Sequence, residues 1–284
     1  NMATGDLNRD GHADLVVVNT GYLSIFMGNG TGGFAPARHL VSNAFAVVIA
    51  DFNKDLKPDL AMTNSDKVLL MLGDGAGGFG PQVSFDAGHS PYDTNSGASP
   101  YGLVAGDFNK DGKLDLATAN YWDSVSVLLG DGAGGFGAAV TYKLDAFDHP
   151  EVLTVGDFNK DGSPDLAVLA PENGRVMVLQ GNGHGVFAVT KSVYVGPFPH
   201  RVLVKDMNGD GKDDLVLTVS QKTNIVALFG DGAGGFGPVT QYPVQADASF
   251  GGLSAGDFNG DGRPDLVTST YPTNNIAVLL NGCE

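Results

Sequence analysis

One acidic string recurs six times along the chain, and it limits the fold more than any other feature does. Each copy reads Asp-x-Asn-x-Asp and continues four residues later into Asp-Leu. The copies begin at Asp6, Asp51, Asp107, Asp157, Asp206 and Asp257. Successive copies start 45, 56, 50, 49 and 51 residues apart, a period that excludes heptads and is typical of arrays of similar structural units.

Each repeat is predicted to form four short strands. In the third repeat, β-rich runs lie at 102–108, 115–119, 124–129 and 136–144, separated by the acidic loop, a short connection and the glycine cluster 130–135. Glycine supplies the positive φ values that tight hairpin turns need. A single four-stranded meander cannot bury both of its faces, but sheets stacked radially about an axis bury them against their neighbours. The sequence therefore predicts an all-β protein, a β-propeller of six four-stranded antiparallel blades.

The predicted propeller is a single domain over residues 1–284, with repeats near 1–44, 45–98, 99–148, 149–197, 198–247 and 248–284. The last repeat ends soon after its third strand, so its outer strand is expected to be missing and Ile276–Leu280 to form an open apolar edge. Such edges favour pairing with another chain. Two interpretations stay open: a short terminal segment lies outside this sequence, or the chain associates with a second copy through its last blade.

Charge and composition exclude several classes of protein. Lys and Arg total 16 against 32 Asp and Glu, a formal charge of -16, which argues against nucleic-acid partners and anionic membrane surfaces. The longest apolar runs, such as 44–50, are too short to cross a membrane, so no membrane insertion is expected. Cys283 is the only cysteine, so no internal disulfide can staple the fold.

The acidic loops have the chemistry of calcium sites. In the third loop, Asp107, Asn109, Asp111 and Asp115 place oxygen at positions 1, 3, 5 and 9, and Lys113 at position 7 would offer its backbone carbonyl. Calcium takes six to eight hard oxygen ligands, and no softer His or Cys ligand recurs here. The alternative, solvated Asp-Gly turns, is weakened by six copies in the same register. We expect up to six bound Ca²⁺ ions that contribute folding free energy.

The predicted metal ligands follow the same five positions in every loop. They are Asp6, Asn8, Asp10, His12 and Asp14; Asp51, Asn53, Asp55, Lys57 and Asp59; Asp107, Asn109, Asp111, Lys113 and Asp115; Asp157, Asn159, Asp161, Ser163 and Asp165; Asp206, Asn208, Asp210, Lys212 and Asp214; and Asp257, Asn259, Asp261, Arg263 and Asp265. The second loop has Leu56 where the others have glycine, so it is expected to be the weakest.

The acidic loop, joined to the string Gly-Asp-Gly-Ala-Gly-Gly-Phe-Gly at 130–137, resembles the FG-GAP (VCBS-type) repeats of integrin α-subunit propellers, fungal lectins of the same fold and many secreted bacterial proteins. The resemblance covers essentially the whole chain. It implies that the calcium loop joins the first and second strands of each blade, and that the protein is secreted or at the cell surface. Integrin-like propellers have seven blades, so seven blades remain the alternative to six.

No catalytic motif stands out, and the protein is not expected to be an enzyme; no catalytic residue is assigned. The six histidines lie in different loops, although His149 and His200 both neighbour proline and belong to connections at the same end of their blades. Loop histidines more often have structural roles than catalytic ones.

A ligand is expected at the blade ends opposite the acidic loops, where the sequence is most irregular. Aromatic and polar side chains there suit sugar rings or protein interfaces. The predicted ligand-binding residues are Tyr92, Tyr101, Tyr121, Trp122, Asp123 and Tyr271. The sequence thus favours a non-catalytic extracellular calcium-binding recognition module for a glycan or an extracellular protein, either a lectin or a cell-adhesion protein. The alternatives are an assembly subunit that associates through an open blade edge and a propeller appendage of a secreted enzyme.

Overall fold

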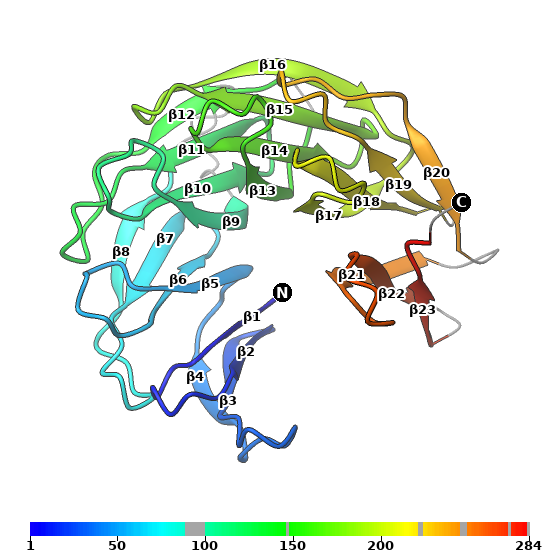
Figure 1. Ribbon diagram of the computed structural model, residues 1–284. Helices are drawn as coiled ribbons and strands as arrows, with labels where there is room; N and C mark the ends of the chain where they lie inside the picture. The colour runs from blue at the N-terminus through cyan, green and yellow to red at the C-terminus, as the bar shows by residue number, and fades with distance from the viewer. Residues whose placement is uncertain (89–99, 146–147, 221–223, 245–248, 272–273, 283–284) are drawn as a thin grey trace. The chain divides into compact units, whose positions relative to one another are not determined.

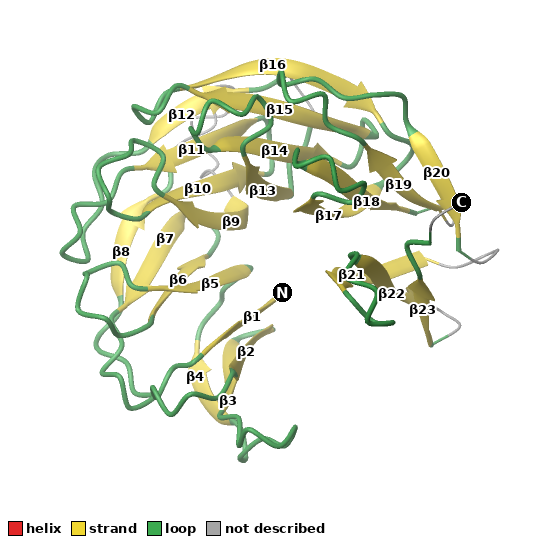
Figure 2. Cartoon of the chain, in the orientation of Figure 1, coloured by secondary structure: helices red, strands yellow, loops and turns green. Residues whose placement is uncertain are grey.

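The computed structural model describes residues 1–88, 100–145, 148–220, 224–244, 249–271 and 274–282 (Figure 1). All regular structure in this part of the chain is β-strand (Figure 2). None of the described segments is a helix long and apolar enough to cross a membrane. The chain divides into two compact units, Asn1–Ala146 and Phe147–Glu284. Each unit contains three antiparallel sheets.

The first unit holds three four-stranded sheets, each with its strands in chain order. The first sheet consists of β1 (Met2–Gly5), β2 (Asp14–Asn19), β3 (Tyr22–Phe26) and β4 (Arg38–Val41). The second consists of β5 (Ala46–Ala50), β6 (Asp59–Thr63), β7 (Lys67–Met71) and β8 (Val83–Asp86). The third consists of β9 (Pro100–Gly106), β10 (Asp115–Asn120), β11 (Ser124–Leu128) and β12 (Val140–Lys143).

The second unit holds two four-stranded sheets and a three-stranded one. Its first sheet consists of β13 (Val152–Gly156), β14 (Asp165–Ala170), β15 (Arg175–Gly181) and β16 (Phe187–Tyr194). The second consists of β17 (Pro199–Lys205), β18 (Asp214–Val219), β19 (Asn224–Leu228) and β20 (Thr240–Pro243). The last consists of β21 (Ser249–Gly256), β22 (Asp265–Tyr271) and β23 (Asn275–Leu279). The prediction that the last blade lacks a fourth strand therefore holds for the described residues.

The core of each unit lies between neighbouring sheets. The first strands of successive sheets contact one another, β1 with β5 and β5 with β9 in one unit, β13 with β17 and β17 with β21 in the other. Second strands are the most buried: every residue of β6, β10, β14 and β18 is buried, whereas the fourth strands β4, β8 and β20 are mostly exposed. Apolar side chains on both faces of the second strand are thus covered by the adjacent sheets.

This arrangement is that of β-propeller blades, and the predicted fold class, an all-β propeller with six blades, is confirmed. Each sheet falls inside one of the six predicted repeats. That the two units form a single domain stays a prediction. The blades are numbered first to sixth below, in chain order.

Candidate functional site

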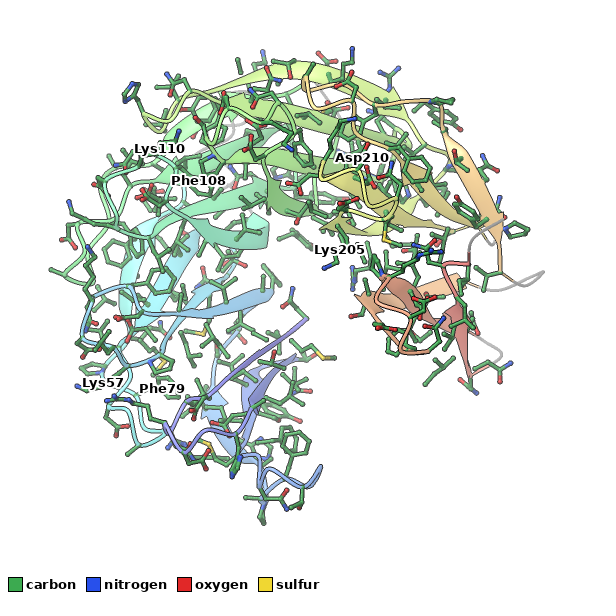
Figure 3. All side chains as sticks on the ribbon, in the orientation of Figure 1. Lys57, Phe79, Phe108, Lys110, Lys205 and Asp210 are labelled. Atoms are coloured by element: carbon green, nitrogen blue, oxygen red, sulfur yellow. The ribbon has the colours of Figure 1, made fainter. Side chains whose placement is uncertain are left out.

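The acidic loops connect the first strand of each blade to the second. In the third blade, Asp107 directly follows β9 and Asp115 begins β10. Figure 3 labels Lys57 in the second loop, Lys110 in the third and Asp210 in the fifth. Because successive strands are antiparallel, the acidic loops lie at one end of the blades, and the connections between second and third strands lie at the other end.

The loop carboxylates fold the loop by accepting backbone N–H groups. In the third loop, Asp107 Oδ2 accepts the N–H of Gly112 at 2.8 Å, and Oδ1 accepts that of Asp111 at 3.0 Å. Asp111 Oδ1 in turn accepts the N–H of Lys113 at 2.9 Å. The bond from position 6 to the first carboxylate recurs in all six loops. The tight loop that brings three oxygen-bearing side chains together is therefore formed by its own hydrogen bonds.

Two positions in these loops have left-handed backbone. Position 6 is glycine in five copies, but in the second copy Leu56 takes a φ of 64° with its side chain 76% exposed. The fourth position is also left-handed, with φ of 60° at Lys54 and 58° at Lys110 and Lys160. Non-glycine residues adopt this region at a cost. Strain at the sixth position was predicted from the sequence; strain at the fourth, where glycine occurs only at Gly209 and Gly260, was missed.

The aspartate at position 9 has a different environment from the other loop carboxylates. Asp115 is fully buried; its Oδ2 accepts the N–H of Phe108 at 2.9 Å and its Oδ1 that of Gly130 at 2.8 Å. The same two bonds, from the second loop residue and from a residue at or just after the end of the third strand, are accepted by Asp14, Asp59, Asp165, Asp214 and Asp265. We call these six residues the brace aspartates, because each ties the acidic loop to the end of the third strand of its sheet.

Burial and neighbouring charges separate the pKa values of the loop carboxylates. A hydrogen bond from the His12 backbone lowers the pKa of Asp10, and one from the Lys57 side chain lowers that of Asp55. Burial raises the pKa of the brace Asp165 to about 6, against two backbone hydrogen bonds, and the charges of Asp161 and Asp157 raise it further. A nearby positive charge favours the ionised form of such a group.

The donor set of the loops fits a hard cation in its chemistry. Position 5 is exposed in every loop and positions 1 and 3 are at least partly exposed. The side chains at these positions offer only carboxylate and amide oxygens, the ligands that calcium prefers. Lysine ammonium groups lie at the position-5 carboxylates of three copies, with Nζ to Oδ2 distances of 3.0 Å from Lys57 to Asp55, 3.2 Å from Lys113 to Asp111 and 2.9 Å from Lys212 to Asp210. Within the described ranges, no three His, Cys, Asp or Glu side chains are gathered in an arrangement that could hold a metal ion. Calcium binding by the predicted ligands stays a prediction.

At the opposite blade ends of the first unit, four aromatic side chains form a continuous row. Phe45 and Tyr101 stack with ring centroids 5.0 Å apart and planes 5° from parallel. Tyr101 lies 5.1 Å from Tyr121, and Tyr121 lies 5.5 Å from Trp122 at an interplanar angle of 73°. Phe45, Tyr101 and Trp122 are each 40% exposed. We call these four residues the aromatic row; it brings partly exposed aromatic side chains of two blades to the surface.

A groove of about 550 Å³ adjoins one end of the aromatic row. Phe45 and Tyr101 line it together with polar groups from the first two blades. The polar lining residues are Asn19, Thr20, Asn43 and Ser65. Amide and hydroxyl groups beside exposed rings can hydrogen-bond sugar hydroxyls while a ring covers an apolar sugar face.

The structure brings together three of the predicted ligand-binding residues, Tyr101, Tyr121 and Trp122, and separates another from them. The side chain of Asp123 is only 2% exposed, so it lies below the surface that the rings form. Tyr92 and the side chain of Tyr271 lie outside the described residues. Phe45 was missed because its neighbours 46–50 are apolar, so the sequence shows only a buried strand beginning there.

A polar cluster lies at the same blade ends of the second unit. His149 Nδ1 is 3.1 Å from Glu172 Oε1, and Asn173 donates to the buried Asp148 at 2.8 Å. Burial raises the pKa of Glu151, which is also influenced by the charge of His200. The sequence predicted that His149 and His200 lie at the same blade ends; the carboxylates beside them had no recognisable sequence signal.

Comparisons with known proteins identify the fold and the repeat. No curated protein matches the chain. A lectin of Agrocybe aegerita, described by its specific recognition of non-reducing terminal N-acetylglucosamine, has 19% identity and a TM-score of 0.65 over 99% of this chain and 80% of its own. A putative 6-phosphogluconolactonase from Bacteroides uniformis has 15% identity and a TM-score of 0.66 over 97% and 79%. Virginiamycin B lyase from Staphylococcus aureus has 13% identity and a TM-score of 0.60 over 100% and 89%.

At such identities the likeness shows a shared fold alone, and the functions named for these proteins are diverse. The repeat itself is more informative. The FG-GAP-like repeat matches residues 6–62, 51–118, 107–168, 157–217 and 206–268, and these matches overlap without a gap. They cover all six acidic loops. The predicted resemblance is confirmed, and the chain belongs to the family of FG-GAP-like repeat proteins.

Proposed function

We propose that this protein is an extracellular carbohydrate-binding module that is stabilised by calcium. The observation that carries the proposal is the aromatic row beside a groove with amide and hydroxyl lining. A sugar stacked on Tyr101 or Trp122 would bury its apolar face, while Asn19 and Asn43 of the groove lining would hydrogen-bond its hydroxyl groups. The structural likeness to a lectin supports the same class of ligand.

Calcium would have a structural role in this proposal. Carboxylate and amide side chains at positions 1, 3 and 5 of each acidic loop, with the backbone carbonyl at position 7, would hold the ion. A bound cation would offset the repulsion among the loop carboxylates that adds to the raised pKa of Asp165. Since the aromatic row lies at the other blade ends, calcium would stabilise the blades that present the row and would not contact the ligand. High external calcium makes an extracellular location the natural one for such sites.

A glycan array with labelled protein, run with calcium and with EGTA, tests the proposal. Binding to a defined set of glycans, lost when Trp122 is replaced by alanine, is the expected result. An array with no bound glycan at any calcium concentration would argue against carbohydrate recognition and favour a protein ligand at the same row.

The polar cluster supports a second candidate function, that of a propeller enzyme. Glu151 has the raised pKa of a general acid, and His149 and His200 lie near it. Lactonase and lyase propellers share the fold with this chain. Among the described residues of the cluster there is no nucleophile with a recognisable activating base, so the recognition module is favoured. Turnover of lactone or ester substrates that is lost in Glu151→Gln would favour the enzyme over the recognition module.

A further inference from the structure

The groove beside the aromatic row has a lining without charged side chains among the described residues. The lining comes from the first blade at 18–21, from the second at 43–45 and Ser65, and from the third at Tyr101. Its polar groups are amides, hydroxyls and backbone groups, so the lining offers no cation to a carboxylate or a sulfate. The whole chain carries a formal charge of -16, which also disfavours anionic ligands. The groove therefore suits an uncharged ligand.

One amide in this lining is held in a single orientation. Asn19, the last residue of β2, donates from Nδ2 to Ser24 Oγ at 2.9 Å and to the carbonyl of Val17 at 3.3 Å. A backbone carbonyl can only accept, so the Val17 contact fixes which end of the amide carries the nitrogen. Ser24 is buried, and its Oγ lies 3.1 Å from His39 Nδ1 on β4, an acceptor for the serine proton. The Asn19 amide is thus positioned by its own blade.

The third blade contains the same arrangement of an asparagine, a serine and a fourth-strand side chain. Asn120 ends β10 as Asn19 ends β2, and its Nδ2 donates to Ser126 Oγ at 2.8 Å. Ser126 Oγ lies 3.0 Å from Thr141 Oγ1. The register is equivalent, because Ser126 and Ser24 each pair with the residue two before the asparagine. Asn120 is fully buried, so the third blade shows this arrangement in a structural role.

The two asparagines differ at the amide oxygen. Thr118 Oγ1 donates to Asn120 Oδ1 at 2.9 Å, and the corresponding residue of the first blade is Val17, which has no hydroxyl. Asn64 holds the same position after β6, and its Oδ1 accepts two backbone N–H groups at 2.9 and 3.3 Å. In the described part of the chain, Asn19 is the one member of this set whose Oδ1 has no hydrogen-bond donor, and it is the one that lines the groove.

A fixed amide oxygen without a donor is a prepared acceptor for a ligand. Because both bonds of Nδ2 hold the Asn19 amide before a ligand arrives, little side-chain freedom is lost on binding. A site that is built to hydrogen-bond a ligand hydroxyl rejects a ligand that cannot donate there, since the acceptor is then left unpaired. The same oxygen repels the oxygen atoms of a carboxylate or a sulfate.

We propose that the amide oxygen of Asn19 selects the ligand of the groove by accepting a hydroxyl group of an uncharged sugar, and that sugars with a carboxylate or a sulfate are excluded. This inference rests on the proposed carbohydrate function. It adds the charge class of the ligand and the residue that sets it. Val17 belongs to the device, because a valine at this position leaves the oxygen of Asn19 for the ligand.

Saturation-transfer difference NMR with the full chain tests the proposal. The neutral probes are the methyl glycosides of glucose, galactose, mannose and N-acetylglucosamine. The anionic probes are the methyl glycosides of glucuronic and galacturonic acid at neutral pH. At least one neutral glycoside should bind, and neither uronic acid should. The dissociation constant of the neutral glycoside is then measured by titration for the wild type and the variants.

Val17→Thr is the most informative variant, because it gives the first blade the donor that Thr118 supplies in the third. Val17 does not line the groove. The new hydroxyl would occupy Asn19 Oδ1 and should weaken the neutral glycoside about two- to tenfold, the contribution of one hydrogen bond. Asn19→Ala removes the acceptor and should weaken binding at least as much. Val83→Thr, the same exchange at a half-exposed position of β8, should leave the affinity unchanged.

The possible failures are distinguishable. If neither neutral nor acidic glycosides bind the wild type, carbohydrate recognition fails and this inference fails with it. If a uronic acid binds as tightly as the neutral glycoside, or if Val17→Thr and Asn19→Ala bind like the wild type, carbohydrate binding stands and the role of Asn19 is overturned. Equal weakening by Val83→Thr would also overturn it, because the loss would then be a general effect of the exchange on the fold.

Discussion

The carboxylate of Asp115 accepts the N–H of Gly130 at 2.8 Å, and with its other oxygen it accepts the N–H of Phe108. Asp115→Asn keeps the size of the side chain and replaces one acceptor by a donor that faces a buried N–H. A buried donor left unpaired costs about 1–3 kcal/mol. We expect the free energy of unfolding to fall by that amount in urea denaturation.

Asp131→Asn is the matched control. A single oxygen of Asp131 accepts both of its turn bonds, from Ala133 and Gly135, so an amide can make both of them. Asn29 and Asn182 already make the same pair of bonds in the first and fourth blades. The control should change stability by less than about 0.5 kcal/mol. Equal losses of unfolding free energy in the two variants would show that the brace bonds stabilise the fold no more than the turn bonds of Asp131 do.

Calcium should raise the melting temperature of the protein, and EGTA should lower it. Three carboxylates in one short loop repel one another, and an ion that binds only the folded loop stabilises it by about 2.7 kcal/mol at a hundred times its dissociation constant. Differential scanning calorimetry across a calcium titration measures the shift, with magnesium at the same ionic strength as the control. A transition that excess EGTA leaves unchanged would contradict the calcium proposal.

Much of this fold could be predicted from the sequence because its determinants are local. The period of the acidic loops gives the number of blades, and glycine clusters mark the turns. The role of the brace aspartates could not be predicted, since Asp115 meets Gly130 only after the second and third strands have paired. The aromatic row brings Phe45 of the second blade against Tyr101 of the third. No local pattern in the sequence predicts that these two rings stack. Local sequence patterns therefore predict the strands and turns of each blade but not the side-chain contacts between blades.

The second acidic loop should become more stable when its leucine is replaced. Leu56 has a φ of 64°, a conformation that costs about 1–2 kcal/mol for a residue with a Cβ atom. Glycine removes this strain but loses about 0.5–1 kcal/mol through the freedom of the unfolded chain. Leu56→Gly should therefore raise the free energy of unfolding by up to about 1.5 kcal/mol in urea denaturation.

The reverse exchange, Gly112→Leu in the third loop, checks this explanation. An added Cβ there would meet only the Lys54 ammonium at 3.8 Å, so any loss reflects backbone strain and not a clash. We expect a loss of about 1 kcal/mol. If both exchanges destabilise the protein, the leucine of the second loop makes a contact that outweighs its strain.

Glu151 should make stability depend on pH in a defined direction. Burial raises the pKa of Glu151 above its ordinary value, so the folded protein holds the proton more tightly than the unfolded chain does. Ionisation is therefore more costly in the folded state, and stability falls as the pH rises from the ordinary value through the raised one. Below that window Glu151 has no such effect. His149, His200 and Arg201 oppose the shift, and Glu172 reinforces it.

Comparing the wild type with Glu151→Gln by urea denaturation between pH 4 and pH 8 isolates this contribution. The variant should gain stability over the wild type as the pH rises, and the two should converge at low pH. Asp66→Asn in the first unit serves as the control because this carboxylate lies outside the polar cluster and its side chain is 50% exposed. A difference that grows toward low pH would show that attraction to the histidines outweighs burial.

Trp122 should report ligand binding directly, because it is the only tryptophan in the chain and lies at one end of the aromatic row. A sugar that stacks on the row displaces water from the indole and should shift or quench its emission, with a saturable dependence on sugar concentration. Tyr101→Ala leaves this reporter in place while it removes the ring that joins Phe45 to Tyr121. Loss of a stacking ring of this kind should weaken binding about two- to tenfold, since an aromatic contact contributes about 0.5–1.5 kcal/mol. Tyr194→Ala, an exposed aromatic of the second unit, should leave the titration unchanged. A sugar found on the glycan array that leaves the Trp122 emission unaffected would place carbohydrate binding away from the aromatic row.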